Sequence, residues 1–328
     1  MLQDQPIKIL LNDNLNELWP TKQDLINELH HEFPNVTFKQ GYTESEQQIH
    51  IVDADATFGI PTAKIFALNK KLKWVHHPMS GFELEHNHPI VLSKVILTNA
   101  PNAHVVPMAE YVFATMLSIT HRIDEHFKDQ REKKLDPTKY LSSIKDLNGQ
   151  NLGIIGYGEV GKAIARRGYG FGMNIFGLSR TKPLCKSEIA TVWPSDHIEQ
   201  LLKISDWIVI AAPLTQHTRD LINTHNIHMI RKNAHVIVLS RPHIINEDAL
   251  ITELRKGNLA GAVFDNLENK WLSDSSPLWT MDNVIITPHT SSMSSNLEKD
   301  RFDIYRTNIR RFITGEKFIR VANKTLGY

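Results

Sequence analysis

The sequence is short of cysteine: its 328 residues include only Cys185, so no disulfide can form within the chain. Such a composition is typical of a reducing compartment. No apolar run reaches the roughly 18–20 residues of a membrane-spanning helix. The first residues hold an early aspartate and no basic leader of the secretory type. These absences predict a cytoplasmic protein with no membrane segment.

An excess of charge is missing as well. Lys and Arg number 37 against 36 Asp and Glu, which leaves a formal net charge of +1. A near-neutral chain has no global electrostatic reason to bind nucleic acid or an anionic membrane. The hydrophobic content of 41% is ordinary for a globular protein, and the length favours two domains.

Short apolar runs alternate with longer helical patterns, which predicts an α/β fold with parallel sheets. Thr21 is expected to begin a helix that ends near His31, and Pro61 one that ends near Leu68. An apolar helix is expected at 105–123, followed by an irregular polar segment at 126–146. Five strands are expected before that helix, at 7–11, 36–39, 56–58, 74–76 and 95–98.

A second α/β series begins at mid-chain. A helix capped by Asn246 and ended by Gly257 is expected between two of its strands, and an amphipathic helix is expected at 295–314. Six strands are expected in this series, at 152–155, 174–178, 207–210, 235–239, 261–264 and 284–287.

A G-x-G-x-x-G motif follows the first of these strands. Gly156 permits a tight turn, Gly158 lets a pyrophosphate approach the backbone, and Gly161 lets the helix pack closely on the strand. The helix N-terminus supplies free N–H groups and a partial positive charge for the phosphates. The motif therefore predicts a dinucleotide site, formed by Gly156, Tyr157, Gly158, Glu159, Val160 and Gly161.

The end of the next strand carries Ser179, Arg180 and Thr181. NAD-binding proteins usually place an acidic residue here, which holds the ribose 2′-hydroxyl. A carboxylate would repel a 2′-phosphate, whereas these three side chains can bind one through charge-assisted hydrogen bonds. The sequence therefore favours NADP(H) over NAD(H).

Later segments resemble the D-isomer-specific 2-hydroxyacid dehydrogenase family in order and spacing. The resemblance covers about 147–292, and the cofactor loop at 179–181 is similar to the glyoxylate/hydroxypyruvate reductase branch. Looser similarity reaches 80–81 and 97–100. The segments that carry the resemblance are 212–223, 238–250, 260–265, 276–279 and 283–292.

The resemblance implies two Rossmann-like or flavodoxin-like domains with parallel sheets. A dinucleotide-binding domain at 101–293 would be inserted into a substrate domain made of 1–100 and 294–328. It also implies a homodimer, because the long helix before the glycine motif packs across a dimer interface in this family.

The same resemblance implies an activity, the NADPH-dependent reduction of a small 2-keto acid, such as glyoxylate or hydroxypyruvate, to the D-2-hydroxy acid. Arg241 would polarise the keto oxygen and hold the carboxylate, and His289 would donate the proton. Asp265 would orient the nicotinamide carboxamide. Backbone N–H groups of the loop at Met79, Ser80 and Gly81 would bind the substrate carboxylate. Further cofactor contacts would come from Ala212, Pro213, Thr218 and Ser240.

One position departs from the family pattern. Lys270 stands where most members carry a glutamate that hydrogen-bonds the histidine. A lysine about 4 Å from a protonated His289 would oppose that charge by roughly 4 kcal/mol as an upper limit. Lys270 can instead turn to solvent, with Glu268 serving as the partner of His289; the sequence leaves both arrangements open. Lys270 is also the main support for an alternative function, a catalytically weak NADP(H)-sensing protein on the same fold.

Two other hypotheses find less support. His76, His77, His86 and His88 are close in sequence, but no cysteine or regularly spaced acid accompanies them. Solvated loop histidines are therefore expected there, and no metal site. A short-chain dehydrogenase would need Tyr-x-x-x-Lys after the glycine motif, and the sequence contains none there.

Overall fold

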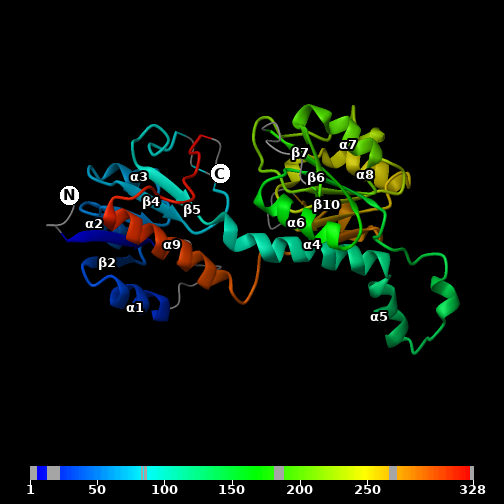
Figure 1. The fold of residues 1–328 in the computed structure, drawn as a ribbon, viewed down its shortest axis with the longest axis horizontal. Helices are drawn as coiled ribbons and strands as arrows, with labels where there is room; N and C mark the ends of the chain where they lie inside the picture. Colours follow the sequence, from blue (N-terminus) through cyan, green and yellow to red (C-terminus); the bar gives the residue numbers. More distant parts are fainter. Residues whose placement is uncertain are drawn as a thin grey trace. The chain divides into compact units, whose positions relative to one another are not determined.

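The structure is a computed structural model, which describes residues 6–12, 23–82, 84, 87–180, 188–265 and 272–325. The chain divides into two compact units. Unit 1 comprises Met1–His104 and Ser294–Tyr328, and unit 2 comprises Val105–Met293. Figure 1 shows unit 1 in blue, cyan and red and unit 2 mainly in green and yellow.

Unit 1 is built on a parallel five-stranded sheet with the order β2-β1-β3-β4-β5. Successive side chains of β1 point to opposite faces, so Ile9 belongs to one apolar cluster and Leu10 to another. The helices α1 (Gln23–Glu32) and α9 (Leu297–Thr314) cover the Ile9 face, and α2 (Glu44–Ile51) and α3 (Ala63–Ala67) cover the Leu10 face. The strands are β1 (Ile7–Asn12), β2 (Val36–Gly41), β3 (Ala56–Phe58), β4 (Trp74–His77) and β5 (Ile96–Asn99).

Unit 2 is built on a parallel seven-stranded sheet with the order β12-β11-β10-β9-β6-β7-β8. The helices α4 (Val105–Thr120) and α6 (Glu159–Gly170) pack on one face, and α7 (Ile198–Ile204) and α8 (Glu247–Arg255) pack on the other. The strands are β6 (Asn151–Ile155), β7 (Asn174–Ser179), β8 (Thr191–Pro194), β9 (Trp207–Ile210), β10 (His235–Val238), β11 (Gly261–Asp265) and β12 (Val284–Thr287).

The direction of the strand order reverses between β6 and β9. From β6 the chain proceeds outward to β7 and β8, and it then returns to β9 on the other side of β6. In open parallel sheets, ligands bind outside the carboxyl ends of the strands at such a switch point. The topology therefore places the candidate dinucleotide site at the carboxyl end of β6.

The predicted fold class, α/β with two parallel sheets, is confirmed. The prediction of an irregular segment at 126–146 is wrong, since α5 (Ile123–Arg131) and the short helix η3 (Pro137–Tyr140) lie there. Side-chain hydrogen bonds connect the two helices. Asp129 is 8% exposed and accepts hydrogen bonds from Tyr140 Oη at 2.5 Å and Lys139 Nζ at 3.0 Å.

Besides α5 and η3, the described part of the chain contains the helices α2 and α7 and the strand β8, which were not expected from the sequence. Helix α2 does carry a local signal. Thr43 accepts from the Glu46 amide at 3.2 Å while the Glu46 carboxylate accepts from the Thr43 amide at 2.9 Å, a capping box. Only two residues of this eight-residue helix are buried, so its apolar periodicity is weak.

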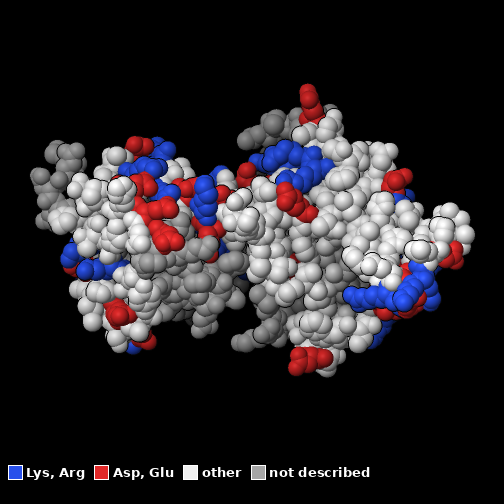
Figure 2. Space-filling view, turned by 90° about the horizontal axis from the view of Figure 1, so that it is seen from below, with Lys and Arg blue, Asp and Glu red and all other residues white. Residues whose placement is uncertain are grey.

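Among the described helices, none is long and apolar enough to cross a membrane. On the face in Figure 2, Lys and Arg side chains lie among Asp and Glu side chains within each unit. This mixture matches the near-zero net charge of the chain.

Candidate active site

The glycine motif forms the turn between β6 and α6. Gly156 has a φ of +101°, and a Cβ atom there would lie 2.5 Å from the Ala212 amide nitrogen. A Cβ atom at Gly161 would lie closer than 3.0 Å to the Gly156 carbonyl oxygen. At Gly158 a Cβ atom would meet nothing within 4 Å. Gly156 and Gly161 are thus required by packing, whereas Gly158 borders open space, as a phosphate contact needs.

The N-terminus of α6 has amides to offer to an anion. Leu178 O accepts from the Gly156 and Tyr157 amides at 3.2 and 2.8 Å. Gly158 is the N-cap residue and provides no side-chain cap. Among the described residues, the amides of Glu159, Val160 and Gly161 donate to no acceptor. These first-turn amides and the helix dipole fit the pyrophosphate of a dinucleotide.

The residues expected to select the cofactor lie at the carboxyl end of β7. Ser179 is the last residue of that strand and is half-buried, and Arg180 follows it with an exposed side chain. Because β7 pairs with β6, this end of the strand adjoins the glycine turn. Thr181 lies outside the described residues.

The loop after β9 forms the other wall of the glycine turn. Ala212 is buried, and its backbone lies beside Gly156. Thr218 Oγ1 donates to Pro213 O at 2.7 Å and accepts from the Thr215 amide at 2.7 Å. The hydroxyl of Thr218 therefore shapes this loop, which holds the predicted cofactor residue Pro213.

Arg241 is the third residue after β10, behind Leu239 and Ser240. Its side chain is part-buried, and Nη1 donates to Ser240 O at 3.1 Å. The Ser240 hydroxyl donates to Ile210 O of β9 at 3.4 Å. Both residues are thus anchored at the carboxyl ends of β9 and β10.

Asp265 is the last residue of β11 and is 1% exposed. Its Oδ1 accepts from Thr287 Oγ1 at 2.6 Å and from the Thr290 amide at 2.8 Å, and its Oδ2 accepts from the Ser291 amide at 2.8 Å. A carboxylate has about four acceptor sites, so these bonds leave one on Oδ2 for a carboxamide N–H. The predicted role of Asp265 toward nicotinamide is compatible with this geometry.

His289 follows β12 in the loop that Asp265 holds. Its φ is +57°, in the left-handed region that few residues other than glycine adopt. The His289 amide donates to Thr287 O at 3.0 Å, which closes a tight turn. The strands β10, β11 and β12 are neighbours in the sheet, so Arg241, Asp265 and His289 follow adjacent carboxyl ends.

The predicted carboxylate-binding loop, Met79–Ser80–Gly81, follows β4 in unit 1. Each of its carbonyl oxygens has a protein partner: Met79 O accepts from the Ala100 amide at 3.1 Å, Ser80 O from Asn99 Nδ2 at 2.6 Å, and Gly81 O lies 3.2 Å from His77 Nε2. In a trans peptide, the N–H points away from the preceding carbonyl.

The peptide amides of Ser80 and Gly81 therefore point away from these partners. Neither donates to another described residue. This is the arrangement that an anion-binding loop needs. Sequence reasoning missed Asn99 and His77 as supports of the loop, although Asn99 stood within a segment that carried the looser resemblance.

The description of His76, His77 and His88 as solvated is wrong, since they are 0%, 7% and 3% exposed; His86 lies outside the described residues. His76 and His77 belong to β4, where strand burial overrides their polarity. Burial lowers the pKa of His76 to about 3 and that of His77 to about 4. Both are therefore neutral near neutral pH, and His77 can donate from Nε2 to Gly81 O.

The structure describes Arg241, Asp265, His289 and the cofactor residues other than Thr181 within unit 2, and the loop at Met79–Gly81 within unit 1. Glu268, Lys270 and Trp271 lie outside the described residues, so both arrangements around His289 stay open.

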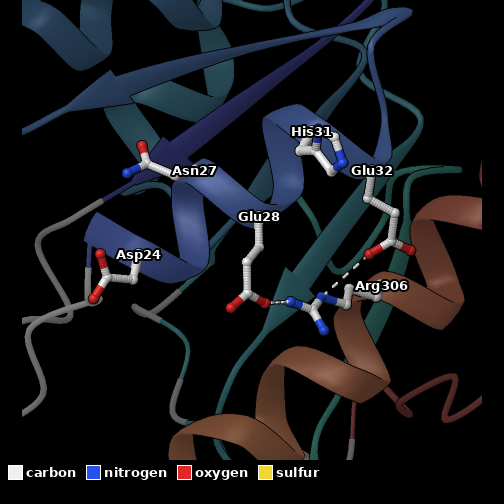
Figure 3. A pocket seen from close by; sticks show the side chains of 6 residues that line it. All are labelled: Asp24, Asn27, Glu28, His31, Glu32 and Arg306. Carbon is white, nitrogen blue, oxygen red and sulfur yellow. Dashed lines mark hydrogen bonds and ion pairs between the residues drawn. The ribbon is translucent and has the colours of Figure 1, made fainter.

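A hollow of about 690 Å³ lies elsewhere in unit 1, between α1 and α9. Arg306 of α9 forms ion pairs with Glu28 and Glu32 of α1 there (Figure 3). Its remaining lining residues are Asp24, Asn27 and His31. None of these residues was predicted as a site residue. The walls of the hollow are open and charged, which fits ion pairing between the two helices.

Comparison with known proteins agrees with the geometry of unit 2. Residues 113–291 match the family model described as D-isomer specific 2-hydroxyacid dehydrogenase, NAD binding domain. The chain is similar to glyoxylate reductase of Thermococcus kodakarensis, with 30% identity over 70% of each chain. It is also similar to D-3-phosphoglycerate dehydrogenase of Methanocaldococcus jannaschii, with 30% identity over 97% of this chain. The match spans only 59% of the length of that second relative.

A solved structure shows the same likeness over the whole fold. The D-isomer specific 2-hydroxyacid dehydrogenase family protein from Aeromonas salmonicida subsp. salmonicida A449 superposes with a TM-score of 0.80 and 26% identity. The match covers 98% of this chain and 100% of that one. The family predicted from the sequence is confirmed, and the chain belongs to the D-isomer specific 2-hydroxyacid dehydrogenase family.

Proposed function

We propose that the protein reduces a small 2-keto acid, such as glyoxylate or hydroxypyruvate, to the D-2-hydroxy acid with NADPH. The observation that carries the proposal is the set Arg241, Asp265 and His289 at the carboxyl ends of three adjacent strands, in the same sheet as the glycine turn. A fixed guanidinium, a fixed carboxylate and a histidine suit hydride addition to a carbonyl. In this proposal unit 2 binds the dinucleotide and unit 1 the substrate.

Each unit contributes one set of donors that is assigned to the substrate carboxylate. In unit 1 the amides of Ser80 and Gly81 donate to it, because the carbonyl groups of their loop are already bonded. In unit 2 the guanidinium of Arg241 offers a planar fork of donors. The same guanidinium stabilises the negative charge that builds on the keto oxygen during the reaction.

The nicotinamide of the bound cofactor supplies the hydride. The free acceptor site on Asp265 Oδ2 orients the carboxamide, and the amides at the start of α6 hold the pyrophosphate. His289 donates the proton that converts the developing alkoxide into the hydroxyl group. Its partner is Glu268 if Lys270 turns to solvent.

The preference for NADPH rests on Ser179 and Arg180. Ser179 ends the strand that neighbours the glycine turn, and Arg180 follows it, is exposed and is able to reach a 2′-phosphate. Replacing Arg180 with alanine should weaken NADPH binding about 10-fold to 100-fold, the value of about one charge-assisted hydrogen bond. NADH binding should change little. Equal binding of NADPH and NADH by the unaltered protein would contradict the preference.

A homodimer is part of the proposal. Large apolar side chains are exposed on α4, α5 and the segment that follows. Solvent-exposed patches of this kind mark interaction surfaces. Sedimentation of the protein and of a Phe127→Glu variant would test it, since the variant should be monomeric. The exposed side chains are Val106, Ile123, Phe127, Leu135, Leu141 and Ile144.

The activity is tested by following NADPH oxidation with a panel of 2-keto acids. Arg241→Ala and His289→Ala should each lower kcat/KM by about 100-fold or more. The controls are Arg255→Ala and His225→Ala, which replace exposed residues of α8 and of a loop in unit 2. Loss of activity in both controls would show that the loss in the Arg241 and His289 variants reflects unfolded protein and not a lost catalytic group.

The second candidate is a catalytically weak NADP(H)-sensing protein, favoured by Lys270 at the position of the usual glutamate. It predicts tight NADPH binding without turnover on the whole panel. A Lys270→Glu variant separates the candidates, because it should create or raise reductase activity only if Lys270 faces His289.

A further inference from the structure

A chain of hydrogen bonds connects α4 to the loop that carries His289. Tyr111 Oη lies 2.6 Å from Thr287 Oγ1, and Thr287 Oγ1 lies 2.6 Å from Asp265 Oδ1. Tyr111 is on the second turn of α4, and Thr287 is 176 residues further along the chain at the end of β12. All three residues belong to unit 2.

The direction of these bonds is determined by the chemistry of the groups. Carboxylate and carbonyl oxygens only accept hydrogen bonds, so the single hydroxyl proton of Thr287 goes to Asp265 Oδ1 at 2.6 Å, the shorter bond, or to Phe264 O at 3.4 Å, and in neither case to Tyr111. Tyr111 must then donate to Thr287 Oγ1. Burial raises the pKa of Tyr111 to about 12, so the phenol keeps its proton throughout the physiological range.

Asp265 connects these hydroxyl groups to the loop that carries His289. Its two oxygens accept from the amides of Thr290 and Ser291, the two residues directly after His289. The loop needs such anchoring because His289 has a φ of +57°, which costs free energy in a residue other than glycine. Without the two bonds, the backbone at His289 could relax to another conformation.

We infer that Tyr111 and Thr287 are positioning residues for the proton donor, acting through Asp265 on the backbone that carries His289. The inference rests on the proposed function, since it assigns these residues to the same reaction. Thr287 holds the Asp265 carboxylate in one rotamer, and Tyr111 holds the Thr287 hydroxyl. One face of α4 thereby fixes the angle at which the imidazole is presented to the substrate.

The test uses Tyr111→Phe, Thr287→Val and Thr287→Ser in the full-length chain. Displacement of a reacting group by about 1 Å can lower a rate about 100-fold, so Tyr111→Phe and Thr287→Val should lower kcat between about 10-fold and 100-fold. KM for the keto acid and the Kd of NADPH should change less than about threefold. Thr287→Ser keeps the hydroxyl and should restore most of kcat.

A deuterium isotope effect distinguishes positioning from a loss of folded protein. If the proton donor is misplaced, the chemical step limits the rate, and the primary isotope effect with NADPH deuterated at the transferred position should rise. A merely destabilised protein would lose active molecules and keep the isotope effect. Matched controls are Tyr169→Phe on α6, with an exposed ring, and Thr115→Val on α4, whose hydroxyl donates to Val112 O of its own helix and to no other residue that the structure describes.

Amide hydrogen exchange tests the relay without any turnover. The Thr290 and Ser291 amides should exchange faster in Thr287→Val and Tyr111→Phe than in the unaltered protein. Their exchange rates should be unchanged in both controls. Unaltered exchange and an unaltered isotope effect in these two variants would overturn the inference. If the unaltered protein reduces no keto acid, the proposed function fails, and the exchange rates still decide whether the relay holds the loop.

Discussion

The substitution Gly161→Ala separates two opposing effects within α6. Alanine is a better helix former than glycine by about 1 kcal/mol, so the change would stabilise an unconstrained helix. At this position the new Cβ atom would lie 3.2 Å from Ile154 Cγ2 and closer than 3.0 Å to the Gly156 carbonyl oxygen. A backbone oxygen in a tight turn has no flexible end that could move aside.

The steric effect should exceed the gain in helix propensity. Overpacking of a well-packed site costs typically 1–3 kcal/mol and occasionally more, and this overlap involves backbone, so about 3 kcal/mol is expected. The net destabilisation is then about 2 kcal/mol. In a unit of this size, that corresponds to a fall in Tm of roughly 4–8 °C. NADPH affinity should fall about 10-fold, because the strain shifts the Gly156 turn that precedes the phosphate-binding amides.

Gly170→Ala is the matched control, because Gly170 ends the same helix and a Cβ atom there meets nothing within 4 Å. It should leave NADPH binding unchanged and leave Tm unchanged or slightly higher. Thermal unfolding followed by circular dichroism and fluorescence titration with NADPH measure both quantities. A Gly161→Ala protein as stable as the unaltered one would refute the argument that close packing requires glycine there.

Three further predictions concern other parts of the chain. Asn99→Ala removes the donor to Ser80 O. In steady-state kinetics it should raise KM for the keto acid about 10-fold and leave the Kd of NADPH unchanged. A changed Kd with an unchanged KM would contradict this prediction. The pKa values of His76 and His77 are lowered in the folded chain, so the unfolded chain binds more protons as the pH falls from 6.5 toward 4. Unit 1 should therefore lose stability over this range, by roughly 2 kcal/mol for each histidine at pH 5. Urea unfolding at pH 7.5 and 5.0 checks this, and His77→Gln should flatten the dependence. Asp129→Ala should loosen the segment at 121–146, which limited trypsin digestion would detect as faster cleavage after Arg131; equal cleavage rates would show that the contacts with Lys139 and Tyr140 are dispensable.

Much of the fold was predictable because its signals are local. Short apolar runs mark the parallel strands, and the strands at Trp207–Ile210 and Val284–Thr287 were predicted with the bounds they have. The glycine motif was predictable for the same reason, since strand, turn and helix follow one another within a few residues. The α5 segment was not, because its mean character is polar and its burial depends on Asp129 meeting Tyr140 eleven residues later.

The sequence by itself determined the α/β class, the dinucleotide turn, the family, and the chemical identity of Arg241, Asp265 and His289. Each of these depends on residue types at short spacing. Only the tertiary structure decided what holds these groups in place. Asn99 and His77 support the loop at Ser80 and Gly81 from neighbouring strands, and Tyr111 reaches Thr287 across 176 residues of chain. The bonds from Asn99 to Ser80 O and between Tyr111 and Thr287 leave no periodic pattern in a single sequence, because partners 19 and 176 residues apart become neighbours only when the sheet and its helices pack.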